Sequence, residues 1–455
     1  MAYAEKRVST AKGSKGKVSW RARYKRPDGV WGSEPGFPSK RLAEQWGEEQ
    51  EAAIRKGTWI DPELMRKHFG VWAREFMKAR PKRGRTNTRR WEYLEQYIFP
   101  QWQHTPLIAI SWFDVESWSR TLPCDDVTIG HVVSFMSTVM TGAVDAKHLL
   151  VNPLFGRRRT EKKKPARPKK SAEDKVVPAE IVLQVADRLG PANGLAVIAT
   201  AFLGPRLGEL FGLHRDNALK TRRQQDDGGW FECPIIRIDP DVGELAEYDE
   251  RDEEGNKLGT VLRLEPPKSE AGERGIDVPP FLALLLAIHK ADWPHPILFC
   301  TPSGTFWRRN NWGRILRPAA DGRPERKKRR GVSARAAWAP LMPGMTMRDL
   351  RHTHDSWQEQ IGVKEPLAYE SAGHKRKGIK AVYQHPTPEM RRERLDGLQQ
   401  IYEDAMANLG WTTLWGRVDL AKRRPENDLP NIAQMISRGA RGRRQALQKY
   451  RSVAG

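Results

Sequence analysis

Cysteine is scarce in this chain of 455 residues, which contains Cys124, Cys233 and Cys300. An odd number of widely separated cysteines suggests neither a disulfide framework nor a zinc site. Long apolar runs are also lacking, since no stretch approaches the ~20 uninterrupted apolar residues of a membrane-spanning helix. The opening sequence MAYAEKRVST has no apolar core like that of a signal peptide. We therefore expect a protein of a reducing cytoplasm that has no membrane segment.

Acidic residues are outnumbered, with 56 Asp and Glu against 79 Lys and Arg, which gives a formal net charge of +23. Such an excess favours a polyanionic partner, because Lys and Arg neutralise phosphates and release condensed counterions. Nucleic acid is the first partner that this indicates, and a membrane surface is the alternative. A hydrophobic fraction of 38% and 17 tryptophans exclude a disordered chain. The length predicts roughly two to four folded units.

Residues 1–62 have the pattern of a small module. Alternating large and polar side chains predict a strand over 18–24, a Pro-Asp-Gly turn follows, and a second strand begins at 30. Apolar spacing predicts a helix from about 40 to 56, with Leu42, Trp46 and Ala53 on one side of it. A small sheet backed by one helix would result.

Residues 63–155 are predicted to form a bundle of three or four helices, because their apolar side chains recur at helical spacing. The predicted core consists of Phe69, Trp72, Phe76, Trp91, Leu94, Ile98, Val115, Trp118, Val132, Val133, Met136, Val139 and Met140.

Five arginines of these two units are candidate DNA contacts. Arg21 and Arg23 would project from the polar face of the first strand. Arg83 and Arg85 lie in a basic turn and Arg89 follows it, at a helix start where side chains and free N–H groups can hold phosphates together. A solvated surface explains each group equally well.

The segment 156–175 is predicted to be a linker, because RRRTEKKKPARPKK is too charged to pack and is broken by prolines. Repulsion between like charges keeps it extended, and a DNA backbone beside Lys163, Lys164 and Lys169 would relieve that repulsion. A nuclear-localisation signal is the other interpretation of such a tract.

Residues 176–409 are expected to form a larger mixed domain, followed by a C-terminal tail over 410–455. An apolar stretch at 195–203 supplies its core. Helices are expected at 178–189, 281–290, 312–316, 347–360 and 389–409, and strands at 235–238 and 260–264, separated by an acidic, turn-rich insertion. The predicted fold class of the whole chain is mainly α with small β-sheets (α+β).

Four segments of this domain carry groups suited to binding an anion. In the first, GPRLGEL, Arg206 would stand in the first turn of a helix, and Glu209 three residues later could orient its guanidinium. In the second, Lys268 is expected at a hairpin tip after a strand. Taken singly, a surface ion pair and a solvated lysine explain these two segments.

The third segment is RDLRHTH, which begins at Arg348. Thr346 followed by Asp349 has the form of a capping box, so a helix should start there. Arg348, Arg351 and His352 then share one side of the first turns, where the helix dipole favours an anion. In the fourth segment, His374 stands nine residues before Tyr383, and His385 follows closely, in basic surroundings.

In this order, the four segments resemble the catalytic domain of the tyrosine recombinases, the family of phage integrases and related site-specific recombinases. The resemblance covers residues 176–409, and the units before it look similar to the arm-site-binding and core-binding domains of integrases. It implies a site-specific DNA recombinase that cleaves and rejoins strands through a 3′-phosphotyrosine link and so integrates or excises a mobile element.

The resemblance also implies a role for each residue. Arg206 and Arg351 would clamp the phosphate, His374 would be an added donor, Tyr383 would be the nucleophile, and Lys268 would protonate the leaving oxygen. No metal and no other cofactor is expected, because the covalent link conserves the energy of the broken bond.

One position departs from the family pattern, since Arg348 stands where the family most often has histidine. A guanidinium keeps its proton at working pH, so Arg348 can bind phosphate but cannot accept the tyrosine proton. Water or His385 remain as acceptors, and His352 and Glu209 are expected in supporting roles.

The partners implied are double-stranded DNA attachment sites, a homotetramer on synapsed DNA, a DNA-bending host factor and an excisionase-type directionality factor, in the nucleoid of a bacterial host. The helix at 389–409 is expected to dock on a neighbouring subunit. A type IB topoisomerase uses similar residues, but a small module and a bundle before the catalytic domain favour strand exchange. A non-catalytic DNA-binding relative is the other alternative, and the presence of all five site residues argues against it.

Overall fold

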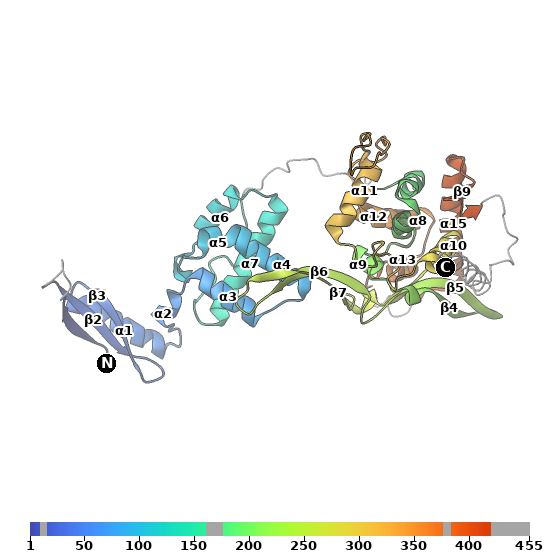
Figure 1. Ribbon diagram of the computed structural model, residues 1–455. Coiled ribbons are helices and arrows are strands. Elements are labelled where there is room, and N and C mark those ends of the chain that lie inside the picture. Colours follow the sequence, from blue (N-terminus) through green and yellow to red (C-terminus); the bar gives the residue numbers. More distant parts are fainter. Residues whose placement is uncertain (10–15, 161–175, 376–383, 420–455) are drawn as a thin grey trace, which may run out of the picture. The chain divides into compact units, whose positions relative to one another are not determined.

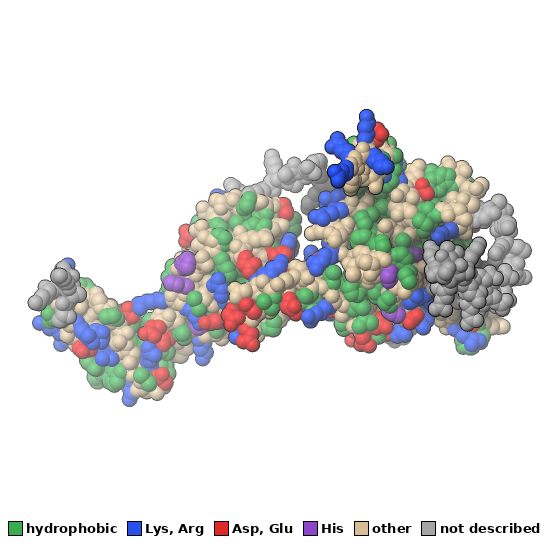
Figure 2. All heavy atoms as spheres, viewed as in Figure 1, with side chains coloured by type: hydrophobic (Ala, Val, Ile, Leu, Met, Phe, Trp, Pro, Cys, Tyr) green, Lys and Arg blue, Asp and Glu red, His purple; other side chains and the backbone are tan. Residues whose placement is uncertain are grey.

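A computed structural model describes residues 1–9, 16–160, 176–375 and 384–419 (Figure 1). The chain divides into two compact units, one of residues 1–168 with 251–258 and the other of 169–250 with 259–455. The described elements are mostly helices with small antiparallel sheets, which confirms the predicted fold class. Lys and Arg side chains are visible on the surface of both units (Figure 2).

The first unit begins with a three-stranded antiparallel sheet, β1 (Tyr3–Val8), β2 (Val18–Lys25) and β3 (Trp31–Phe37), in the order β1-β2-β3. Helix α1 (Lys40–Arg55) packs against it. The sequence did not predict β1. On the predicted apolar side of α1, Trp46 packs against Tyr24 of β2, whereas Leu42 is 46% exposed. Ala43 and Gly47 are the buried positions of α1 instead.

The rest of the first unit is the predicted helical bundle. Its elements are α2 (Pro62–Met65), α3 (Phe69–Ala79), α4 (Gly84–Tyr93), the π-helix η1 (Leu94–Ile98), α5 (Phe99–Trp102), the 3₁₀ helix η2 (Leu107–Ala109), α6 (Trp112–Thr121) and α7 (Asp126–Asp145). All thirteen predicted core side chains belong to one apolar cluster, although Trp118 and Val133 are only partly buried in it.

Helix α7 is long and apolar enough to cross a membrane by length and composition alone. Its apolar side is used inside the bundle, however, where Ile129, Val132 and Met136 are fully buried. Packing against α3, α4 and α6 accounts for the apolar character of α7.

The second unit surrounds one long helix, α8 (Ala179–Leu203), which is broken at Gly190, where φ is 72°. The other helices are α9 (Leu207–Phe211), η4 (Arg215–Asn217), η5 (Glu270–Gly272), α10 (Pro280–Asp292), α11 (Arg309–Asp321), α12 (Met347–Gln360), α13 (Glu365–Ala372) and α15 (Pro388–Asn408). Helices α10, α11, α12 and α15 all pack against α8, whose segment 195–203 is buried throughout, as predicted.

A small sheet of β4 (Ala218–Asp226), β5 (Gly229–Ile238) and β8 (Arg274–Asp277) lies beside these helices, in the order β4-β5-β8. A separate hairpin, β6 (Glu244–Arg251) and β7 (Lys257–Glu265), interrupts the chain between β5 and β8. The predicted strands at 235–238 and 260–264 fall within β5 and β7, whereas β4 and β6 were not predicted.

Two boundary predictions need correction. The tail does not begin at 410, because Leu414 is fully buried and β9 (Thr413–Leu414) pairs with β10 (Val418–Asp419). Helix α15 buries Leu398 and Tyr402 in its own unit, and its docking on a neighbouring subunit stays a prediction. The Tyr402 ring stacks on Phe281 of α10, with 3.8 Å between ring centroids.

The predicted linker also starts later than 156. Arg159 forms an ion pair of 2.9 Å with Asp126 at the start of α7, and Thr160 donates two hydrogen bonds to the Glu116 carboxylate, from its backbone N at 2.8 Å and its hydroxyl at 2.9 Å. Residues up to Thr160 are therefore held by the bundle. Lys163, Lys164 and Lys169 lie outside the described residues.

The packing of α7 on α3 predicts the effect of an added methyl group. A Cβ at Gly142 would lie 2.6 Å from the Phe76 ring, so Gly142→Ala should lower the free energy of unfolding by about 1–3 kcal/mol. Gly130→Ala in the same helix is the control, because the nearest atom to its added Cβ is Arg159 Nη2 at 3.9 Å. That change should be neutral or stabilise by up to ~1 kcal/mol. Urea unfolding compares the two, and equal losses would contradict the packing.

Candidate active site

Arg206 is positioned by the turn between α8 and α9. Helix α8 ends at Gly204, whose φ is 67° and where an added Cβ would meet the His354 ring at 2.4 Å. Beyond this turn, Arg206 donates to both oxygens of Glu209, from its backbone N and from Nη1, at 2.7 Å each. Since Glu209 is 1% exposed, this is a buried acceptor rather than a surface ion pair. The predicted orienting contact is present.

Arg274 of β8 shares the same carboxylate. Its Nη1 and Nη2 donate to the two Glu209 oxygens at 3.1 and 3.0 Å, and its Nε donates to the carbonyl of Ser371 at 2.9 Å. Burial alone would raise the pKa of Glu209, but the hydrogen bonds and charges of Arg274 and Arg206 outweigh it and lower that pKa. Glu209 is therefore a fixed anion between two arginines.

Arg274 was missed at the sequence level, where it looks like one more charge in GERGID. A signal was available, because Arg274 alternates with the buried Ile276 and Val278 and so shares their strand face.

Helix α12 carries Arg351, which lies near Arg206. The capping box of Thr346 and Asp349 is formed as predicted. Arg351 then donates from Nη1 to the carbonyl of Gly204 and from Nη2 to that of Ala372, the latter at 2.8 Å. Burial, followed by the nearby charge of Arg206, lowers the pKa of Arg351.

The two arginines meet at the C-terminal end of α13. Arg351 contacts Ala372, and Arg206 Nη2 donates to the carbonyl of Gly373 at 3.4 Å. Two guanidiniums side by side form a site where an anion with several oxygens, such as a phosphate, would be bound by both.

His374 follows directly and is exposed beside this end of α13, with its backbone N bonded to the Tyr369 carbonyl at 3.0 Å. Burial, then the charges of Arg351 and Arg206, lower the pKa of its imidazole. The ring is therefore neutral near pH 7 and can donate one hydrogen bond. The structure thus brings Arg206, Arg351 and His374 together, with Glu209 behind them.

Arg348 and His352 lie on the exposed side of α12, as the helical spacing predicts. Arg348 Nε donates to His352 Nε2 at 3.3 Å, so the bound partner of Arg348 is a neighbour on its own helix. Leu350 and Trp357 are buried on the opposite side.

Lys268 is exposed but does not stand at a hairpin tip, so this prediction was wrong. The tip of the β6–β7 hairpin is the turn at 252–256, whereas Lys268 lies in the loop between β7 and η5. It precedes the site residue Arg274 by six positions in the sequence.

Tyr383 lies outside the described residues, while His385 is described and exposed. The helices on either side of the undescribed segment are tied together. Glu370 of α13 accepts two hydrogen bonds from Arg391 of α15 at 3.0 Å each, and Arg391 also donates to Asp277 at 2.7 Å. Gln224 of β4 donates to the carbonyl of Pro386 at 2.9 Å.

The candidate DNA contacts of the first unit differ in their surroundings. Arg21 and Arg23 are half-buried on the polar face of β2, and Arg23 pairs with Glu5 at 3.4 Å. Arg83 and Arg85 are exposed at the start of α4. Arg89 already has internal partners, since it pairs with Glu92 at 2.8 Å.

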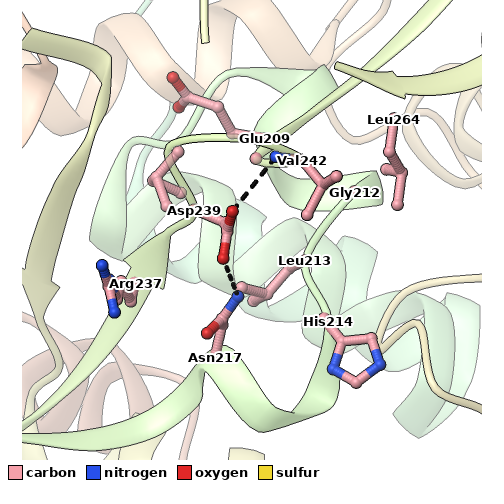
Figure 3. A pocket seen from close by; sticks show the side chains of 11 residues that line it. Glu209, Gly212, Leu213, His214, Asn217, Arg237, Asp239, Val242 and Leu264 are labelled. Atoms are coloured by element: carbon pink, nitrogen blue, oxygen red, sulfur yellow. Dashed lines mark hydrogen bonds between the residues drawn. The ribbon is translucent and has the colours of Figure 1, made fainter. Parts of the chain in front are cut away.

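A cavity of about 310 Å³ opens beside α9, and its lining includes Glu209, the carboxylate that holds Arg206 (Figure 3). Its central polar group, the Asp239 carboxylate, accepts from the backbone N of Asp241 at 2.9 Å and of Val242 at 3.2 Å, and from Asn217 at 3.4 Å. Asp239 therefore stabilises its own turn. In the described part of the chain, no three or more His, Cys, Asp or Glu side chains are grouped so as to hold a metal ion.

Comparisons with known proteins add the following. No family model matches the chain. In two strains of Mycobacterium tuberculosis, a protein described as "Putative prophage phiRv2 integrase" is 24% identical over 379 residues, which cover 80% of this chain and 88% of that protein. Among solved structures, the Tn1549 transposon integrase in complex with transposon right end DNA gives a TM-score of 0.46, with 15% identity over 73% of this chain and 100% of that chain. A lambda integrase tetramer bound to a Holliday junction gives a TM-score of 0.43, with 13% identity over 79% of this chain and 94% of that chain.

Because Arg274 shares the Glu209 carboxylate with Arg206, we expect Arg274→Met to destabilise the fold strongly. Glu209 would keep only Arg206 and would remain buried, so the free energy of unfolding should fall by about 3–5 kcal/mol. The control is Arg223→Met on β4, because Arg223 and its partner Glu232 are 59% and 54% exposed. That pair should contribute no more than ~1 kcal/mol. Equal losses of stability in urea unfolding would show that Arg274 is an ordinary surface charge.

Proposed function

We propose that the chain is a tyrosine recombinase of the phage-integrase family, and that it cleaves and rejoins DNA strands at specific sites through a covalent link to Tyr383. The observation that carries this proposal is the meeting of Arg206, Arg351 and His374 at the end of α13. Tyr383 follows nine residues after His374. The curated relatives, prophage integrases by description, support the same function.

The arginine pair suits the charge that develops when a phosphodiester is attacked. Negative charge spreads over the equatorial oxygens of a five-coordinate phosphorus, and groups that already point at those oxygens stabilise it without reorganising. Arg206 is held by Glu209, and Arg351 by two backbone carbonyls. His374, neutral near pH 7, supplies a further hydrogen bond.

In the proposed reaction, the Tyr383 hydroxyl attacks the phosphorus and loses its proton. The bond from phosphorus to the 5′ oxygen breaks, which leaves a 3′-phosphotyrosyl link on one fragment and a 5′-hydroxyl on the other. Lys268 gives the leaving oxygen its proton. Attack by a 5′-hydroxyl on the phosphotyrosine reverses these steps and rejoins the strand, so the exchange needs no other reactant.

Arg348 has a different role from the histidine that the family most often carries there. It is exposed, bonded to His352 and permanently charged, so it can bind a neighbouring phosphate but cannot take the proton of Tyr383. Water or the exposed His385 accepts that proton.

The partners follow from the same proposal. They are double-stranded DNA attachment sites, three further copies of the chain in a homotetramer on synapsed DNA, a DNA-bending host factor and an excisionase-type directionality factor, and the place of action is the bacterial nucleoid.

Removal of the nucleophile tests the reaction. Wild-type protein incubated with a nicked duplex that carries its attachment site should give a covalent protein–DNA species in a denaturing gel, and Tyr383→Phe should give none. Tyr369→Phe is the control, because Tyr369 is 38% exposed on α13 and its ring lies 6.3 Å from that of His374. It should retain the covalent species. Absence of that species from wild type would refute the proposal, and relaxation of supercoiled DNA without any site would favour a topoisomerase.

The role of Lys268 has its own test. Lys268→Ala should cleave ordinary DNA at least ~100-fold more slowly, the usual scale of general-acid catalysis. It should cleave a 5′-bridging phosphorothiolate almost normally, because sulfur leaves without an acid. Arg206→Ala is the control and should be slow on both substrates, since sulfur does not replace a phosphate clamp. Equal defects of Lys268→Ala on the two substrates would remove Lys268 from this role.

A further inference from the structure

A basic hairpin connects α11 to α12 and has no part in the site described above. Its two sides pair at Arg323 with Trp338, at Arg326 with Arg335 and at Arg329 with Val332. Each pair exchanges two backbone hydrogen bonds of 2.8 to 3.0 Å. A turn with Gly331 at φ 74° closes the hairpin. Residues 323–338 therefore form a defined two-stranded ribbon.

The base of this ribbon is fixed to the helical core. The Trp338 ring lies under the guanidinium of Arg323, 3.2 Å from the ring centroid, and Arg188 of α8 is 5.4 Å from the same centroid. Arg188 also donates to the carbonyls of Ala319 and Ala339, at 2.8 and 2.9 Å. The ribbon consequently projects from a rigid attachment.

The outer half of the ribbon is a run of five basic side chains, Arg326, Lys327, Lys328, Arg329 and Arg330, all exposed. Among the described residues, none of the five forms an ion pair with a carboxylate. Many other arginines of this unit differ, since Arg222, Arg274 and Arg391 each share a buried carboxylate. Figure 2 shows basic side chains gathered on a projection above α11. The hairpin therefore concentrates positive charge that the described residues leave without acidic partners.

We propose that this hairpin binds the phosphate backbone of duplex DNA outside the cleavage site. Duplex DNA offers one negative charge for each ~1.7 Å of its axis, which matches a dense run of cations. A protein partner fits less well, because interfaces between proteins need an apolar centre, and the outer half has one large apolar side chain, Val332, 38% exposed.

The location supports contact with the same DNA molecule as the arginine pair. Trp338 lies eight residues before Thr346, which begins the helix that carries Arg351. The identification of DNA as the anion rests on the proposed function. The hairpin adds a sequence-independent contact, because phosphates carry no base information.

The test replaces Lys327, Lys328, Arg329 and Arg330 together by Gln in the full chain that also carries Tyr383→Phe, so that binding stays non-covalent. The probe is a fluorescent duplex of mixed sequence, titrated at several salt concentrations. Each lost phosphate contact lowers the slope of log affinity against log salt by about 0.9, so we expect a total decrease of roughly 2–4 and affinity at low salt at least ~10-fold weaker.

The matched control removes four charges that already have partners in the same unit, by Arg223→Gln, Arg237→Gln, Arg263→Gln and Arg417→Gln. These arginines pair with acidic side chains at 3.2, 3.5, 2.9 and 2.9 Å, respectively. The control should change the slope by less than half as much. Equal slopes for the two variants, or loss of self-assembly with DNA affinity unchanged, would overturn the proposal. Unchanged thermal unfolding excludes misfolding.

The two proposals fail separately. A normal covalent species from wild type, with an unchanged salt slope in the hairpin variant, would refute the hairpin and leave the recombinase reaction standing. A lowered slope without any covalent species from wild type would support the hairpin and refute the reaction.

Discussion

A single buried carboxylate, that of Glu209, holds the candidate active site together. It is shared between Arg206, which follows the end of α8, and Arg274 on β8, while Arg274 also holds the backbone of α13 at Ser371. Three separate parts of the chain are thereby fixed around one anion. Three guanidiniums, of Arg206, Arg274 and Arg351, lie near one another with Glu209 and Asp355 as the carboxylates. Positive charge remains in excess, and a bound phosphate would offset it.

A second buried carboxylate, that of Asp277, helps to fix the helices that precede and follow Tyr383 in the sequence. Arg222 of β4 donates to it at 2.5 Å and Arg391 of α15 at 2.7 Å, and both arginines also reach Glu370 of α13. Burial would raise the pKa of Asp277, but the charges of Arg391 and Arg222 lower it overall. The sheet, although small, therefore adds to the direct bonds between Glu370 of α13 and Arg391 of α15. Its role is electrostatic as much as structural.

Local signals in the sequence predicted the parts of the site that depend on neighbouring residues. The capping box of Thr346 and the three-residue spacing of Arg206 and Glu209 are of this kind, and both are formed. The burial of Glu209 depends on Arg274, which is 65 positions away, and no local pattern reveals such a pair. The basic hairpin was missed for a related reason. Its strands lack the alternation of apolar and polar side chains that predicts a strand, because backbone bonds and one tryptophan hold them instead.

The arginines of the second unit thus fall into groups with different physics. Arg222, Arg274 and Arg391 share buried carboxylates and organise the fold. The arginine pair, of which Arg206 is itself held by Glu209, and the basic side chains of the hairpin are available to anions. Salt screens exposed charges over roughly 8 Å at physiological ionic strength, whereas partly buried charges are screened much less. Arg351 is half-buried, but Lys327 to Arg330 are exposed. In the proposed function, the hairpin would therefore govern salt-sensitive capture of DNA, and the arginine pair would act on the reacting phosphate with little dependence on salt.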